Sequence, residues 1–203
     1  MAITFHPDGR IIDSAGNDLA YKPIYDVWQL TGNLTGNQNI IAGSAWTRSS
    51  TTNTNKSGAH TNVGAAMSVD STGYWTFPSS GKWEVTLSCN WQSVSGTACR
   101  WCEPHLYFTQ NNSDYNYIAR PQGSVHSAGA GVYDTFEMTA LLDIVDTSTH
   151  KIYFRVAYET GNNNYLKGYS TFMASYASFI RICLLYTSPS PRDVEESRMP
   201  SSA

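Results

Sequence analysis

The sequence feature that most constrains the fold is a strictly alternating run near the middle of the chain. Every second position from residue 83 to 91 is apolar: Trp83, Val85, Leu87, Cys89 and Trp91. The positions between them, and Lys82 before them, are polar. Side chains on a β-strand point to opposite faces with a period of two, so this run predicts a strand with one buried face.

Two further stretches repeat this pattern, and turn-forming residues separate them. One places five apolar side chains on the same face: Phe136, Met138, Ala140, Leu142 and Ile144. The other places four: Ile152, Phe154, Val156 and Tyr158. Shorter apolar runs lie at 106–108 and 176–182, and polar turn clusters lie at 111–114, 123–131, 146–149 and 161–164. Many strands separated by turns predict an all-β fold, an antiparallel jelly-roll β-sandwich.

We expect one sandwich domain over residues 26–182, a length that suits a single all-β unit. Within it, residues 31–66 predict short strands joined by long loops. Residues 1–25 predict a short N-terminal hairpin or extension, in which segments 3–5 and 10–12 flank the turn-forming Pro7, Asp8 and Gly9. This hairpin would be either an attachment segment or an edge ribbon of the sandwich.

The last 21 residues, 183–203, do not resemble the rest of the chain. Residues 183–193 (CLLYTSPSPRD) and 197–203 (SRMPSSA) resemble the translation of two parts of a transposase-type sequencing adapter, with an index-sized gap between them. We therefore interpret 183–203 as a non-native tail read from assembled environmental DNA and set it aside. The alternative is a genuine Ser- and Pro-rich tail. On the first interpretation, the native C-terminus lies at or beyond Ile182.

Composition excludes several classes of protein. The net charge is −3 and only 14% of residues are charged, without a basic stretch, so we expect no nucleic-acid partner. The sequence contains no run of 18 apolar residues, so we expect no membrane insertion. The first residues also lack the apolar core of a classical secretion signal. Three cysteines precede the tail, an odd and small number that argues against a disulfide-built fold.

The segment 73–83 resembles a signature of the tumour-necrosis-factor-like jelly roll, in particular of the globular heads of the complement first-component family. Gly73, Thr76, Pro78 and Gly81 match the pattern G-x-F-T-x-P-x-x-G-x-Y, and tryptophans stand at two of its aromatic positions. The resemblance extends weakly over residues 65–182 and implies a homotrimer. The chain has no collagen-like stalk, so the complement role does not carry over.

The first 12 residues resemble the starts of virion proteins from uncultured bacteriophages, in which such heads cap fibres. Our leading hypothesis is a non-enzymatic virion module, a phage tail-fibre or decoration head that contacts other virion proteins and binds a host-surface glycan or protein. The competing hypothesis is a secreted or cell-surface domain, lectin-like or cytokine-like, with an extracellular location. A third class is a carbohydrate-active enzyme, which would need two facing carboxylates among Asp114, Asp134, Glu137 and Glu159.

The candidate ligand-binding residues are aromatic or amide side chains in polar loops: Tyr115, Tyr117, Asn163 and Tyr165. Exposed aromatic side chains beside Asn and Gly are suited to stacking on sugars or to flat protein contacts, and Trp101 shares this setting. The alternative is that they pack under loops or between subunits.

The sequence offers no catalytic motif, and we predict no catalytic residue, no metal and no cofactor. Cys99, Cys102 and His105, with Cys89 upstream, have a spacing that could bind zinc. A disulfide, Cys99–Cys102 or Cys89–Cys99, is a second alternative. We favour inert thiols, because Cys89 lies in phase with the apolar face of its strand and a free core cysteine packs as a small hydrophobic residue.

Overall fold

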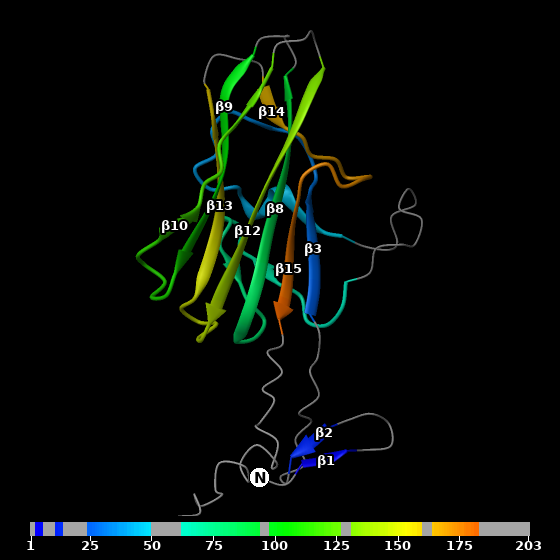
Figure 1. Cartoon of the computed structure of the whole chain (residues 1–203), viewed down its shortest axis with the longest axis vertical. Coiled ribbons are helices and arrows are strands. Elements are labelled where there is room, and N and C mark those ends of the chain that lie inside the picture. Colours follow the sequence, from blue (N-terminus) through cyan, green and yellow to red (C-terminus); the bar gives the residue numbers. More distant parts are fainter. Residues whose placement is uncertain are drawn as a thin grey trace, which may run out of the picture.

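The computed structural model describes residues 3–5, 11–13, 24–49, 62–93, 98–126, 131–159 and 164–182. It confirms the predicted all-β jelly-roll sandwich, with two antiparallel sheets packed face to face (Figure 1). Within these ranges the one helix is the short 3-10 helix η1 (Gly43–Ala45), and no helix there is long and apolar enough to cross a membrane.

Sheet I contains the two longest strands of the molecule. Its order is β4 (Leu34–Thr35), β14 (Asn164–Leu166), β8 (Gly81–Ser93), β15 (Tyr176–Ile182), β3 (Ile24–Leu30) and β5 (Trp46–Arg48). The free edge of β8 pairs along its whole length with β12 (Val132–Ile144). Figure 1 shows β12, β8, β15 and β3 side by side in this layer.

Sheet II forms the other layer. Its order is β10 (Asn116–Ala119), β9 (Cys99–Thr109), β13 (Lys151–Tyr158), β7 (Trp75–Thr76) and β6 (Ser68–Val69). A further strand, β11 (Gly123–Val125), pairs with the same edge of β9 as β10 does. The 123–131 cluster, which we predicted as a turn, therefore begins with a strand.

The alternation in the sequence correctly predicts which face of each long strand is buried. The five apolar side chains of β8 are at most 1% exposed. On β13 the predicted set Ile152, Phe154, Val156 and Tyr158 is also buried. On β12, Met138, Leu142 and Ile144 are buried, and Phe136 and Ala140 pack against the core at its margin.

Aromatic side chains from both sheets fill the centre of the core. Trp75 of β7 is fully buried and has edge-on contacts with Trp28 and Trp46, at centroid distances of 5.2 and 5.5 Å. It also contacts Phe154 and Phe179, at 5.9 and 5.0 Å. Because one side chain touches strands of both sheets, these contacts fix how the layers pack against each other.

The signature segment 73–83 connects the sheets, and both of its glycines are required by the backbone. Gly73 has φ of 106°, and a Cβ there would lie 2.2 Å from the carbonyl oxygen of Ile41. Gly81 has φ of 134°, a conformation that L side chains rarely adopt. The chain turns between these residues, so that Trp75 and Trp83 enter the core from different sheets.

The predicted N-terminal hairpin is present as β1 (Ile3–Phe5) and β2 (Ile11–Asp13), an antiparallel pair that forms a two-stranded sheet of its own. The second strand begins one residue later than we predicted. The tail, 183–203, lies outside the described residues, as does Asn163.

Candidate ligand-binding site on the outer face of sheet II

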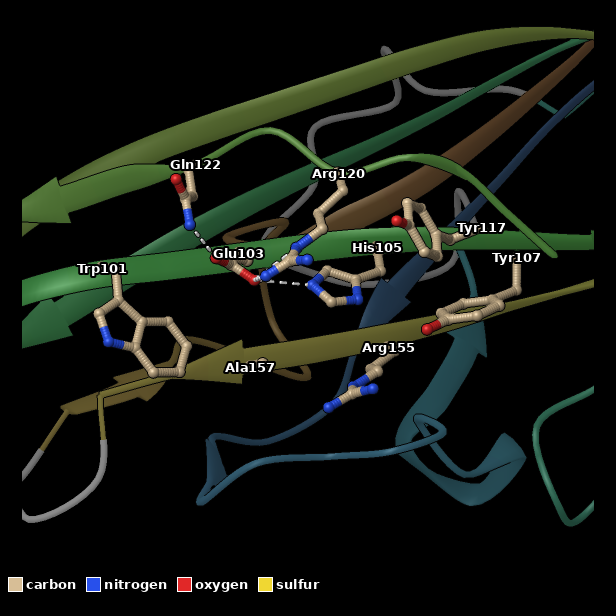
Figure 2. A pocket seen from close by; sticks show the side chains of 9 residues that line it. All are labelled: Trp101, Glu103, His105, Tyr107, Tyr117, Arg120, Gln122, Arg155 and Ala157. Atoms are coloured by element: carbon tan, nitrogen blue, oxygen red, sulfur yellow. Dashed lines mark hydrogen bonds and ion pairs between the residues drawn. The ribbon is translucent and has the colours of Figure 1, made fainter.

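The outer face of sheet II carries polar and aromatic side chains from β9. Alternation along β9 turns Cys102, Pro104 and Leu106 toward the core. The intervening side chains, which face away from the core, are Trp101, Glu103, His105 and Tyr107 (Figure 2). The neighbouring strand β13 is in register, so Tyr153, Arg155 and Ala157 lie opposite Tyr107, His105 and Glu103 on the same face.

Pro104 explains why the edge strand beside β9 is interrupted. Its partner on β13, Val156, directs its own N–H and C=O to Gln38, at 3.0 and 2.9 Å. Members of an antiparallel pair exchange both hydrogen bonds or neither, so the nitrogen of Pro104 also points away from β13. That nitrogen carries no hydrogen and cannot extend a ladder. Accordingly β10 ends at Ala119 and β11 begins at Gly123.

The short connection between β10 and β11 supplies the partners of a buried carboxylate. Arg120 donates to Oε2 of Glu103 from Nε at 2.8 Å, and its Nη2 forms an ion pair with the same oxygen at 2.7 Å. Gln122 donates its amide to Oε1 of Glu103. The Nε2 atom of His105 lies 3.0 Å from Oε2. Glu103 is only 2% exposed, so this network compensates a charge that would otherwise be costly to bury.

The network sets the charge of both buried groups. Burial alone would raise the pKa of Glu103, but hydrogen bonds from Gln122, His105 and Arg120 hold that pKa below its usual range. Burial lowers the pKa of His105, and the charges of Arg120 and Arg155 lower it further, against the effect of Glu103. At neutral pH the site therefore contains an ionised Glu103 and a neutral His105.

The tautomer of His105 follows from its neighbour. An ionised carboxylate only accepts hydrogen bonds, so Nε2 of His105 carries the proton and donates it to Glu103. Nδ1 of His105 is then an acceptor, and it is buried without a partner among the described residues. The same is true of the donor Nε of Arg155, which lies opposite on β13. One donor and one acceptor at the site are thus buried and unsatisfied within the described part of the chain.

These side chains line a depression of about 510 Å³. Its walls are Trp101, Glu103, His105, Tyr107, Tyr117, Arg120, Gln122, Arg155 and Ala157. Figure 2 shows Trp101 at one end and Tyr107 with Tyr117 at the other, with the charged groups between them. The site thus has polar groups at its centre and aromatic side chains at its ends.

A cluster of tyrosines continues the aromatic end. Tyr107 and Tyr153 stack at 4.5 Å with their planes 10° apart. Tyr117 packs edge-on against Tyr107 at 5.9 Å, and Tyr115 contacts Tyr153 at 5.2 Å. Tyr74 closes the cluster through contacts with Tyr115 and Tyr153, at 5.1 and 5.6 Å. Three segments distant in sequence therefore build one aromatic surface.

The structure separates the candidate residues predicted from sequence. Tyr115 and Tyr117 belong to the tyrosine cluster, and Tyr117, at 58% exposed, also lines the depression. Tyr165 lies on β14 of sheet I, where it pairs with Gln92 and donates its hydroxyl to that side chain. Sheet I turns this pair away from the core, on the opposite side of the sandwich from Tyr117. Tyr117 and Tyr165 lie on short strands, although we predicted loops.

The ligand-binding residues predicted from the sequence do not include the polar centre of the site: Glu103, His105, Arg120, Gln122 and Arg155. One signal was available. Trp101, Glu103, His105 and Tyr107 alternate with Cys102, Pro104 and Leu106, as expected for a strand with a polar outer face. A proline inside such a strand also indicates a free edge or a bulge. Nothing local indicated that Arg120 or Arg155 would meet Glu103.

The cysteines do not converge with His105. Cys102 points into the core and His105 points outward from the same strand, so the zinc alternative lacks a common centre. Cys89, Cys99 and Cys102 are buried free thiols. Burial raises the pKa of Cys89, whereas a hydrogen bond from Cys102 lowers the pKa of Cys99 to about 7.

The structure does not pair the carboxylates considered for a hydrolase. Asp134 and Glu137 are three residues apart on β12, so they face opposite sides of sheet I. Asp114 is held in the 111–114 turn, where it accepts a hydrogen bond from Asn111. Glu159 follows β13 and forms an ion pair with Arg100.

Comparison with known proteins identifies the fold. No protein-family model and no curated protein matches the chain. The structure of Eiger TNF from S. frugiperda matches with a TM-score of 0.55 at 12% sequence identity, over 84% of this chain and 98% of that one. Murine APRIL at pH 8.5 matches with a TM-score of 0.52 at 9% identity, over 79% of this chain and 100% of that one. At such identities the comparison shows a shared tumour-necrosis-factor-like jelly roll.

Proposed function

We propose that this tumour-necrosis-factor-like jelly roll is a non-enzymatic binding module that holds a saccharide on the outer face of sheet II. The observation that carries the proposal is the depression itself, with the buried network of Glu103, His105 and Arg120 between aromatic ends. Ligand sites commonly combine apolar walls with a few fixed polar groups that orient the ligand.

The chemistry of a sugar ring matches this arrangement. Its hydroxyl groups both donate and accept hydrogen bonds, so they suit a depression lined by the guanidinium groups of Arg120 and Arg155 and by the hydroxyl groups of Tyr107 and Tyr117. Its apolar face can pack on an aromatic ring, which Trp101 and Tyr117 offer at the two ends. The polar centre is held by hydrogen bonds within the protein, so little ordering remains for the moment of binding.

For the biological setting we propose a virion head on a phage tail fibre or decoration protein, which binds a host-surface glycan and contacts other virion proteins. The first 12 residues support this setting through their resemblance to phage virion proteins. The alternative is an extracellular, lectin-like domain. The binding site is the same in both settings, so the experiment below tests the binding and not the location.

We further propose that three copies associate through the open face of sheet I. The outward side chains of this face include Leu141 and Tyr133, which are 64% and 50% exposed, and the partly exposed Ile180, Tyr176 and Tyr165. Exposed apolar side chains gathered on one face are typical of a contact surface. Identical chains usually assemble with closed cyclic symmetry, and the family resemblance favours threefold symmetry. Three sites would then act together, which raises the affinity for a multivalent surface.

A second candidate is a cytokine-like module that binds a protein. The similarity of fold to Eiger and APRIL favours this candidate. The exposed Tyr117 and Ile118 on β10 could equally contact a protein surface, because exposed tyrosines are frequent in interfaces.

Glycan-array binding of the full chain, followed by calorimetry with a soluble monovalent glycan that binds, tests the proposal. We expect Tyr117→Ala to weaken that binding about fivefold, which corresponds to about 1 kcal/mol of lost ring contact. Tyr133→Ala, a tyrosine of similar exposure on sheet I, is the matched control and should leave monovalent affinity unchanged. Binding to no glycan, or equal losses in both variants, would contradict saccharide binding in this site and favour the protein-binding candidate.

A further inference from the structure

We infer that the site takes an acidic saccharide, one whose ring carries a carboxylate, and that Arg155 binds this carboxylate. The inference rests on the saccharide binding proposed above and narrows it to one chemical class. It gives Arg155, which does not belong to the hydrogen-bond network of Glu103, a role in ligand binding.

The charges in the site are unequal. Both oxygens of Glu103 are occupied within the protein, Oε2 by Arg120 and His105 and Oε1 by Gln122. Arg120 is thereby paired, and His105 is neutral. Arg155 has no carboxylate partner among the described residues. The depression thus contains two guanidinium groups and one carboxylate, with one positive charge in excess. The chain as a whole has a net charge of −3, so this excess is local.

The position of Arg155 favours a carboxylate that lies beside a hydroxyl group. Arg155 and His105 are directly paired on adjacent strands, and side chains of such pairs lie within contact distance. In a hexuronic acid the carboxylate is close to a ring hydroxyl. The planar guanidinium can bind the carboxylate through two parallel hydrogen bonds. The hydroxyl can then donate to Nδ1 of His105 once the side chains that cover this buried atom shift on binding, and that atom otherwise stays without a partner among the described residues.

A pair-wise comparison of acidic and neutral sugars tests this inference. The full chain is titrated with methyl glucuronide and methyl glucoside, and with methyl galacturonide and methyl galactoside, while the indole N–H signal of Trp101 is followed by NMR. We expect the acidic member of at least one pair to bind about tenfold more tightly, as a gained charge-assisted contact implies. Arg155→Gln should remove this preference and change the affinity for the neutral sugar less than about twofold.

Lys151→Gln is the matched control. It removes one positive charge from the same face of the same strand, four residues from Arg155, and should keep the preference for the acidic sugar. Thermal melting of both variants checks that each is folded. Equal binding of acidic and neutral members would overturn the acidic class and leave saccharide binding standing. If neither member of any pair binds, both proposals fail. A preference that survives Arg155→Gln would overturn the role of Arg155.

Discussion

Two buried carboxylates show how the surroundings of a residue separate a structural role from a binding role. Asp26 is fully buried on the inner face of β3, where it accepts from Arg48 at 2.6 Å, Trp28 at 2.9 Å and the N–H of Met67 at 2.7 Å. Trp28 belongs to β3 itself, Arg48 to the neighbouring strand β5, and Met67 directly precedes β6, so all three contacts lie within the protein framework. Glu103 is equally buried, but its partners line an open depression. The burial of Asp26 and Glu103 therefore does not distinguish their roles, whereas the location of their partners does.

At the residue scale we predict that acidification weakens the fold through His105. Burial holds its pKa in the folded protein below the ordinary value of 6.5, helped by Arg120 and Arg155 and opposed by Glu103. As the pH falls below 6.5, the unfolded chain binds the proton first, so the free energy of unfolding decreases until the folded pKa is passed. The pKa of Glu103 is also lowered in the folded protein, so its protonation decreases the free energy of unfolding further at lower pH.

Denaturant unfolding of the wild type and of His105→Gln between pH 7 and pH 5 measures this effect. We expect the wild type to lose more stability over this range than the variant, because glutamine does not titrate. Parallel pH profiles for the two proteins would show that His105 is not the group responsible.

At the element scale, one proline explains how a regular sheet acquires a site. Pro104 removes a hydrogen-bond donor from the outer edge of β9, and the facing chain is divided into β10 and β11. The residues between these short strands carry Arg120 and Gln122 back over Glu103.

The strand β8 gives the second element-scale expectation. Val85→Asp places an unpaired charge in the core, where Val85 is 1% exposed, and should cost more than about 4 kcal/mol, enough to abolish folding. Glu84→Ala, on the outward face of the same strand, should change the stability by less than about 0.5 kcal/mol. Thermal and denaturant unfolding compare the two variants. Equally mild effects would show that the register of β8 is wrong.

At the scale of the whole molecule, the two outer faces of the sandwich differ. Sheet II carries the depression with its excess positive charge. The open face of sheet I carries exposed apolar side chains and an amine between aromatic rings, since Lys167 lies 4.2 Å from the ring centroid of Tyr133 and 5.1 Å from that of Tyr169. This division suits a molecule that associates through one face and binds its ligand with the other.

Light scattering on the full chain at micromolar concentration tests the association. We expect about three times the chain mass of 22.4 kDa. Leu141→Asp, at a side chain that is 64% exposed in one chain, should yield a folded monomer because it would bury a charge in the contact. Ile118→Asp on sheet II, at 45% exposed, is the control and should remain assembled. A stable wild-type monomer would contradict the trimer and weaken the fibre-head proposal.

The sequence by itself determined the class of fold, the phase of the long strands and the positions of most turns. These properties are local: a period of two decides which side chains of β8, β12 and β13 face the core, whatever their partners are. Gly73 and Gly81 likewise indicated a turn, because few other residues adopt their backbone conformation.

Only the tertiary structure decided where the ligand site lies. Glu103 meets Arg120 because the chain returns beside β9, and His105 meets Arg155 because β9 and β13 pair in one particular register. Tyr117 and Tyr165 have similar sequence surroundings, yet opposite sheets place them on opposite sides of the molecule. Such contacts depend on strand order and register, which pair residues distant in the chain and therefore leave no periodic pattern within any one segment.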